Sequence, residues 1–309
     1  MIDLVARRYL FFLISAIIIV PGLISLILPP HLRLGVDFTG GTLWEVQFQK
    51  PVSGKDVLQI LAAHGYGDSL VQASNNNVIL IRAKEIRPDQ PIKAQIANDL
   101  RSHFGPFTEL SFQSVGPSVG TEIWQRSLTA VALASLGILL YLWWAFRHVP
   151  RPYLYGLCAI IALLHDALVV VGIFSILGRF FRVEVDSLFV TALLTVIGFS
   201  VHDTIVVFDR VRENSIRHAG EPFPSIVNHS LLQTLGRSLS TSLTVIFTLS
   251  ALVLFGGDST RLFALALLIG VISGTYSSIF NASMLLVVWE TGELSALFRR
   301  VRAPARAAV

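Results

Sequence analysis

Six long apolar stretches divide this chain of 309 residues. Because a membrane-spanning α-helix needs about 20 mostly apolar residues, each stretch predicts one transmembrane helix. The fifth stretch is short for a span, and the sixth is long enough to tilt or to extend past the bilayer. We therefore expect a membrane α-helical protein with six transmembrane helices, at roughly 9–28, 127–146, 153–177, 187–208, 239–256 and 262–289.

The segment between the first two stretches has the pattern of a small α+β domain. Apolar and polar residues alternate over 42–48, which predicts a half-buried strand with Trp44, Val46 and Phe48 on one face. The other predicted elements are a helix over 54–64, strands over 69–73 and 77–83, a helix over 89–103 and a strand over 107–114. The order βαββαβ is that of the ferredoxin-like split arrangement.

This small domain carries no catalytic constellation. Ser53 followed by Asp56 resembles a capping box and marks the start of its first helix. His64 and His103 both lie near predicted helix ends, where we expect surface or capping roles. By analogy with other open-faced sheet domains, we expect the domain to bind an extended chain.

Composition supports an integral membrane protein. The chain is 53% hydrophobic and 14% charged, whereas soluble domains carry about 25% charged residues. Its single cysteine, Cys158, lies in an apolar run, so we expect no disulfide framework, and the sequence has no CxxC metal motif. It also has no P-loop, so we expect no ATP hydrolysis. We further expect no enzyme activity and no cofactor. The net charge of +4 does not indicate nucleic-acid binding, because the charges cluster at the ends of the apolar stretches.

The distribution of arginines around the spans predicts their orientation. One side receives Arg7, Arg8, Arg147, Arg151, Arg210, Arg212, Arg217, Arg237, Arg299, Arg300, Arg302 and Arg306. The short loops on the other side hold Arg179, Arg182 and Arg261. Since cytoplasmic loops carry the excess of positive charge, both termini are expected in the cytoplasm and residues 30–122 in the periplasm.

The first span resembles a signal peptide, because two arginines precede its apolar run. The run is too long for that, and it ends in Pro29-Pro30 rather than at a small-residue cleavage site, so we interpret it as an uncleaved anchor. The expected divisions are 1–29 (cytoplasmic N-terminus and first helix), 30–122 (periplasmic α+β domain), 123–294 (five-helix region) and 295–309 (basic cytoplasmic tail).

Asp203 lies inside the fourth span, about five residues before its inner end. A carboxylate in hydrocarbon costs roughly 2.5–3.5 kcal/mol on insertion scales, so such residues usually face a bundle interior and serve an ion path, a proton relay or a buried pair. Ser200 and Val207 share its helix face, one turn to either side. His202 points elsewhere, on a stripe that suits close helix packing, with Thr191, Thr195 and Gly198.

Arg237 begins the fifth span at a depth that matches Asp203. A nearby guanidinium favours a charged carboxylate, whereas removal from water favours the neutral one. A movable Arg237 could therefore switch Asp203 between binding and releasing a proton. A static buried pair that only fixes helix register is the alternative.

Further polar residues lie in other spans. Asp166 follows His165 near the middle of the third span, and it is either a second relay station or a buried helix–helix hydrogen bond. Asp186 and Asp209 lie at span ends, where ordinary interfacial roles are expected. The fifth span is rich in serine and threonine, and the sixth carries small residues at helical spacing, which favour close packing and a polar interior: Gly270, Gly274 and Ser278, with Ser273, Ser277 and Asn281.

These residues resemble the motifs of the SecD/SecF family, within the resistance-nodulation-division superfamily. Ile197–Asn214 is similar to the family's fourth-span signature, and Gly35-Val-Asp-Phe-Thr-Gly-Gly41 to the motif after the first span, which includes Asp37, Phe38 and Gly40. Other matching segments are Val115–Glu122, His165-Asp166, Thr234–Ser238, Phe255–Gly257 and Ile269–Thr275. His202 and Phe199 depart from the family pattern, which commonly has Asn and Tyr there. A titratable His202 beside the proton site could shift its working pH, or it could simply pack. Like Asp166, His202 and Ser200 are candidates for a relay or for packing.

The resemblance implies a SecF-like subunit of the bacterial inner membrane. Such a subunit pairs with SecD and uses the proton-motive force to promote preprotein translocation through the Sec channel, SecYEG. YajC and YidC are further partners that the resemblance implies. The family's proton-transport residues correspond to Asp203 and Arg237. The alternatives are half of a proton-coupled exporter of small molecules or lipids, and a passive translocon scaffold.

Overall fold

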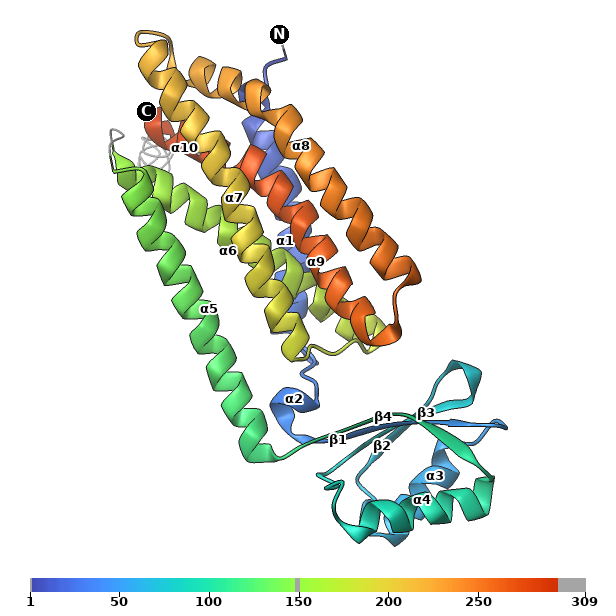
Figure 1. The fold of residues 1–309 in the computed structure, drawn as a ribbon. Coiled ribbons are helices and arrows are strands. Elements are labelled where there is room, and N and C mark those ends of the chain that lie inside the picture. The colour runs from blue at the N-terminus through green and yellow to red at the C-terminus, as the bar shows by residue number, and fades with distance from the viewer. Residues whose placement is uncertain (1, 148–150, 294–309) are drawn as a thin grey trace, which may run out of the picture. The chain divides into compact units, whose positions relative to one another are not determined.

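The computed structural model describes residues 2–147 and 151–293, and it is mostly helical (Figure 1). Within these residues, six helices are long and apolar enough to cross a membrane, as predicted. They are Val5–Ile27, Pro117–Ala145, Pro152–Phe181, Ser187–Arg217, Phe223–Phe255 and Thr260–Glu290. The predicted basic tail, 295–309, lies outside the described residues.

Most of the spans are single α-helices. The first contains a short 3₁₀ turn, η1 (Val5–Arg7), before α1 (Arg8–Ile27), and the next four are α5 (Pro117–Ala145), α6 (Pro152–Phe181), α7 (Ser187–Arg217) and α8 (Phe223–Phe255). The sixth combines α9 (Asp258–Tyr276), the π-helical segment η3 (Ser277–Ala282) and α10 (Ser283–Glu290). A π-helical turn within an α-helix is rare and often marks a functional site.

The expectation that the fifth span is short was wrong. The helix α8 has 33 residues and begins sixteen residues before the apolar stretch that predicted it. Pro224 lies in its first turn, where a missing backbone N–H is harmless. An apolar window marks where a helix can face lipid, whereas backbone hydrogen bonding continues through the polar residues beyond it.

Glycines allow two very close helix contacts in the bundle. An added Cβ at Gly22 in α1 would lie 2.9 Å from the Cα of Gly172 in α6. An added Cβ at Gly270 in α9 would lie 2.1 Å from Cγ2 of Val196 in α7, and one at Gly274 would lie 3.0 Å from Cβ of Ser200. The predicted close packing of the sixth span is therefore confirmed, and its partner is the helix that carries Asp203.

The α+β domain follows the predicted order of strands and helices. Its elements are β1 (Gly41–Phe48), α3 (Gly54–Ala63), β2 (Leu70–Ala73), β3 (Val78–Ala83), α4 (Pro91–Phe104) and β4 (Phe107–Val115). The sheet order is β2-β3-β1-β4, with every neighbouring pair antiparallel. Both helices cover one face of the sheet (Figure 1), where Trp44, Val46 and Phe48 are buried as predicted.

Local details differ from the expected capping. Ser53 caps α3, but its side chain accepts from the backbone N–H of Lys55, and no reciprocal bond from Asp56 is formed in the described residues. His64 ends that helix and contacts Asp99 at 2.7 Å on the domain surface, which agrees with a surface role. The short helix α2 (Val36–Thr39) was not predicted.

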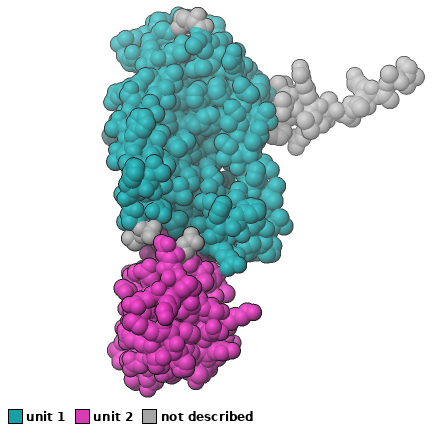
Figure 2. Space-filling model, turned by 90° about the vertical axis from the view of Figure 1, so that its right-hand side faces the viewer, with its two compact units in different colours: residues 1–33, 130–183, 188–309 teal, residues 34–129, 184–187 magenta. Residues whose placement is uncertain are grey.

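The chain forms two compact units, coloured separately in Figure 2. One unit contains 34–129 together with 184–187, and so includes the α+β domain and the first residue of α7. The other contains the remaining residues, and in it α1, α6, α7, α8 and α9 form a helix bundle (Figure 1).

Candidate functional site

Asp203 lies in the interior of the helix bundle. It is 4% exposed and shares its face of α7 with the buried residues Ser200 and Val207. The Ser242 hydroxyl of α8 donates to Asp203 Oδ2 at 3.4 Å. The Thr275 hydroxyl of α9 lies 2.7 Å from Ser242 Oγ, so a short chain of hydroxyls leads from α9 to the carboxylate.

The structure does not form the predicted ion pair between Asp203 and Arg237. Among the described residues, no cation lies within 4.0 Å of the Asp203 carboxylate. Successive residues of an α-helix are rotated by about 100°. The face of α8 that packs into the bundle carries Ser238 and Ser242, which are buried, whereas Arg237 is exposed beside it. The predicted pair is therefore not formed, because Arg237 lies on an exposed face of α8 rather than on the face that packs against Asp203.

Asp166 lies at the centre of a second polar network and is completely buried. Three serine hydroxyls donate to its carboxylate: Ser273 to Oδ1 at 2.7 Å, and Ser200 and Ser277 to Oδ2 at 2.6 Å each. These bonds connect α6 with α7, α9 and η3. Ser200 therefore serves Asp166 rather than Asp203, although it shares a helix face with the latter.

The network continues through His165 to the first span. His165 Nδ1 lies 3.0 Å from Asp166 Oδ1, and its Nε2 lies 3.0 Å from the Ser15 hydroxyl of α1. The Asn281 side-chain amide in turn donates to Ser15 Oγ at 2.7 Å. The sequence analysis did not identify Ser15. The feature that could have revealed it is that Ser15 is a polar residue within the apolar run of the first span.

His202 lies on the outer surface of the bundle. The predicted packing stripe, Thr191, Thr195, Gly198 and His202, is exposed. A Cβ added at Gly198 would meet nothing within 4 Å. Gly198 therefore makes no close contact with another helix in the described part of this chain, and the close packing expected around it is not formed in the single subunit.

The Gly35–Gly41 segment anchors the beginning of α7. Asp37 Oδ2 accepts hydrogen bonds from the backbone N–H of Ser187 at 2.9 Å and from its hydroxyl at 2.6 Å. Since the first N–H groups of a helix lack internal partners and carry partial positive charge, a carboxylate is well suited to cap them. The motif thus holds the start of the helix that contains Asp203, sixteen residues further along.

The glycines of this motif are required by its close contacts. Gly40 and Gly41 have φ angles of 71° and 114°, which L side chains rarely adopt. An added Cβ at Gly40 would lie 2.8 Å from the Cα of Pro117, at the start of α5. Phe38 is buried and packs edge-on against Trp124, with 5.5 Å between the ring centroids.

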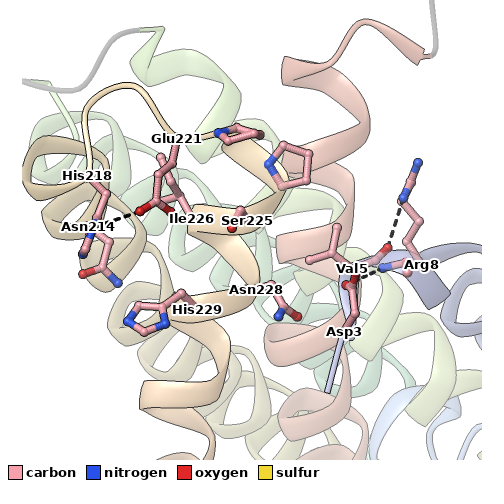
Figure 3. A pocket seen from close by; sticks show the side chains of 13 residues that line it. Asp3, Val5, Arg8, Asn214, His218, Glu221, Ser225, Ile226, Asn228 and His229 are labelled. Atoms are coloured by element: carbon pink, nitrogen blue, oxygen red, sulfur yellow. Dashed lines mark hydrogen bonds and ion pairs between the residues drawn. The ribbon is translucent and has the colours of Figure 1, made fainter. Parts of the chain in front are cut away.

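A polar cavity of about 660 Å³ lies elsewhere in the bundle unit, between η1 and the adjoining ends of α7 and α8 (Figure 3). In it, Asn228 Oδ1 accepts from the Leu4 backbone N–H at 2.8 Å, so α8 holds the N-terminal segment. None of the predicted site residues lines this cavity. In the described ranges, no three His, Cys, Asp or Glu side chains gather as metal ligands would.

Two family descriptions match the chain. "Protein export membrane protein SecD/SecF, C-terminal" covers residues 95–292, and "SecD/SecF GG Motif" covers residues 30–52, which include Gly40 and Gly41. The chain is 58% identical to protein translocase subunit SecF of Thermobaculum terrenum and 45% identical to that of Anaerolinea thermophila, with 99% of this chain and 100% of the relative covered in each case.

A solved structure is also similar. The crystal structure of SecDF from Thermus thermophilus, a translocon-associated membrane protein, superposes with a TM-score of 0.77 at 29% identity. The likeness covers 94% of this chain, which spans only 39% of that longer chain. The SecDF of Bacillus subtilis is 36% identical over 94% of this chain and 38% of its own length.

Proposed function

Because the chain belongs to the SecD/SecF family of protein translocase subunits, we propose that it is a SecF-like subunit driven by the proton-motive force. Asp203 is the proton carrier in this proposal. The observation that carries it is a carboxylate only 4% exposed, which receives one hydroxyl hydrogen bond and no ion pair among the described residues. A buried charge without a partner is costly, so a neutral, protonated carboxylate fits this environment best.

Arg237 senses the charge of Asp203. When the proton leaves, the carboxylate becomes a buried anion close to an arginine that can move toward it. Pairing of Arg237 with Asp203 would shift the packing of α8 against α7. One charge that crosses the membrane supplies about 2.3 kcal/mol per 100 mV, so a few protons suffice for a modest change between two packing states.

In this proposal, the shift in packing between α7 and α8 is transmitted to the α+β domain through Ser187, the first residue of α7. Asp37 caps that helix at Ser187, with hydrogen bonds of 2.9 and 2.6 Å. A displacement of α7 along its axis would therefore pull on Asp37 and move the Gly35–Gly41 segment. We assign the ferredoxin-like arrangement to this domain, because its strand order β2-β3-β1-β4 follows from two split βαβ crossovers. We place residues 30–122 in the periplasm, where the domain would hold the emerging preprotein.

The partners follow from the family. The chain spans 39% of the SecDF structure, so a SecD chain would supply the pseudo-symmetric other half. The proposed assembly further includes SecYEG, YajC, YidC and the preprotein, in the inner membrane with both termini cytoplasmic. The subunit itself would hydrolyse no ATP.

The proposal is tested by Asp203→Asn in inverted membrane vesicles that translocate a labelled preprotein with and without a proton-motive force. Asn mimics the neutral carboxylate in size and shape but cannot release a proton. We expect ATP-driven translocation to persist and its proton-driven stimulation to disappear, while SecD still co-purifies. Asp166→Asn serves as the control for changing a buried carboxylate. Full stimulation by the proton-motive force in the Asp203→Asn complex would refute the proposal.

A further inference from the structure

The Arg237 guanidinium makes no hydrogen bond or ion pair in the part of the chain that the structure describes. The one side-chain hydrogen bond to this residue among those described is accepted by its backbone carbonyl, from the Thr241 hydroxyl at 3.0 Å. Other arginines of the same region are paired: Arg210 and Arg217 with Glu213, and Arg212 with Asp209. An arginine left unpaired among paired ones is available to change partners.

Hydrogen bonds between α7 and α8 fix the level of Arg237 along the helices. Asn214 Nδ2 donates to Ser230 Oγ at 2.8 Å on one side of it, and Ser242 donates to Asp203 at 3.4 Å on the other. In this antiparallel register, Arg237 lies level with residues 207–208. At 1.5 Å per residue, Asp203 is about 7 Å away along the axis in one direction and Asp209 about 2 Å in the other.

A cavity of about 400 Å³ provides room on the Asp209 side. Arg237 lines it from α8, and Val206, Asp209 and Glu213 line it from α7. The arginine therefore adjoins an open space bordered by two carboxylates, and its long side chain can reach along the cavity without repacking the buried core.

Asp209 is the better acceptor of the two carboxylates. Its Oδ1 contacts Arg212 at 2.7 Å, and its Oδ2 has no contact with another charged group among the described residues. Glu213 already binds Arg210 at 2.5 Å and Arg217 at 2.6 Å, one through each carboxylate oxygen. A second guanidinium can thus join Asp209 without displacing a first.

We propose that Asp209 is the second station of Arg237. Resting on the proposed function, the guanidinium alternates between Asp203 when that carboxylate is charged and Asp209 when it is neutral. The sequence predicted an ordinary interfacial role for Asp209, because it lies at a span end. In this proposal Asp209 is instead a positioning residue that holds the Arg237 guanidinium while Asp203 carries its proton. In the structure the guanidinium pairs with neither carboxylate among the described residues, and the cavity beside it leads to Asp209.

The test follows the position of Arg237 by the reactivity of a cysteine in the cavity. Val206→Cys is placed in a Cys158→Ser background of the full membrane complex, since Cys158 is the sole natural cysteine. The rate of labelling by a water-soluble thiol reagent is compared with Asp203→Asn and with Asp209→Asn added. Arg212→Gln is the matched control, because it removes the partner that Asp209 already has.

With Asp203→Asn, Arg237 should remain in the cavity, and labelling should be slowest. With Asp209→Asn, the arginine loses its station in the cavity and should pair with Asp203 whenever that carboxylate is charged, so labelling should rise several-fold. Arg212→Gln and the conservative Asp209→Glu should leave the rate near that of the parent. Equal labelling of the Asp209→Asn and parent complexes would overturn the proposal. This readout needs no translocation, so it fails independently of the proton-coupling proposal. Asp209 is 55% exposed, so the Asn variant should fold normally.

Discussion

Replacing Asp166 by alanine should destabilise the complex strongly, because this carboxylate joins three segments of the bundle. It accepts three serine hydroxyls at 2.6–2.7 Å. Removing it leaves Ser200, Ser273 and Ser277 buried without that acceptor, and each unsatisfied buried donor costs about 1–3 kcal/mol. Even at the lower end the three together reach about 3 kcal/mol, a large fraction of the stability of a typical folded protein.

The assay is thermal unfolding of the purified complex in detergent, with Asp203→Asn measured beside it. Asp203 receives a single bond of 3.4 Å, so its neutral replacement should change stability by less than about 1 kcal/mol. Asp166→Asn should fall between the two, because its carbonyl oxygen still accepts while its amide faces hydroxyls that can rotate. If Asp166→Ala unfolds at the parent's temperature, the network does not hold the bundle, and a relay role for Asp166 gains support.

Three other predictions concern the bundle contacts, the motif and the chain ends. Gly270→Ala should destabilise by about 1–3 kcal/mol through overpacking, whereas Gly198→Ala, which meets nothing within 4 Å, should be neutral or slightly stabilising by thermal unfolding. Asp37→Asn should weaken the cap at Ser187 and reduce proton-driven translocation more than ATP-driven translocation, measured in the same vesicles; equal losses would contradict the coupling route. Burial raises the pKa of Glu293, but hydrogen bonds from neighbouring Tyr and Arg side chains outweigh it and hold the pKa below its usual 4.5. Its contribution to stability should therefore be present above about pH 4.5 and disappear as the pH falls through the lowered pKa, as unfolding of the parent and of Glu293→Gln across this range would show.

The membrane spans and the strands could be predicted because they depend on local patterns. Runs of apolar residues locate each span, and strict alternation placed Trp44, Val46 and Phe48 on the buried face of β1. Helix ends were less accurate, as the long polar start of α8 shows. The backbone hydrogen bonds of α8 continue through polar residues before the apolar stretch, so a search for apolar residues does not detect this part of the helix.

The site was only partly predictable, because direction around a helix depends on the neighbours. The cost of a charge in hydrocarbon identified Asp203 as interior, and the structure buries it. The sequence predicted Arg237 beside Asp203, but the structure places it on an exposed face of α8. The contact between Asp37 and Ser187 joins residues 150 positions apart, and no local pattern in the sequence relates two such segments.

The measurement that tests the central claim most directly is proton uptake by vesicles that contain the complex with SecD, followed with a trapped pH-sensitive dye. Asp203→Asn should abolish the uptake that the complex mediates under a membrane potential, while Asp203→Glu retains part of it because the carboxylate is kept. Uptake at the parent's rate by an intact Asp203→Asn complex would contradict the assignment of Asp203 as the proton carrier.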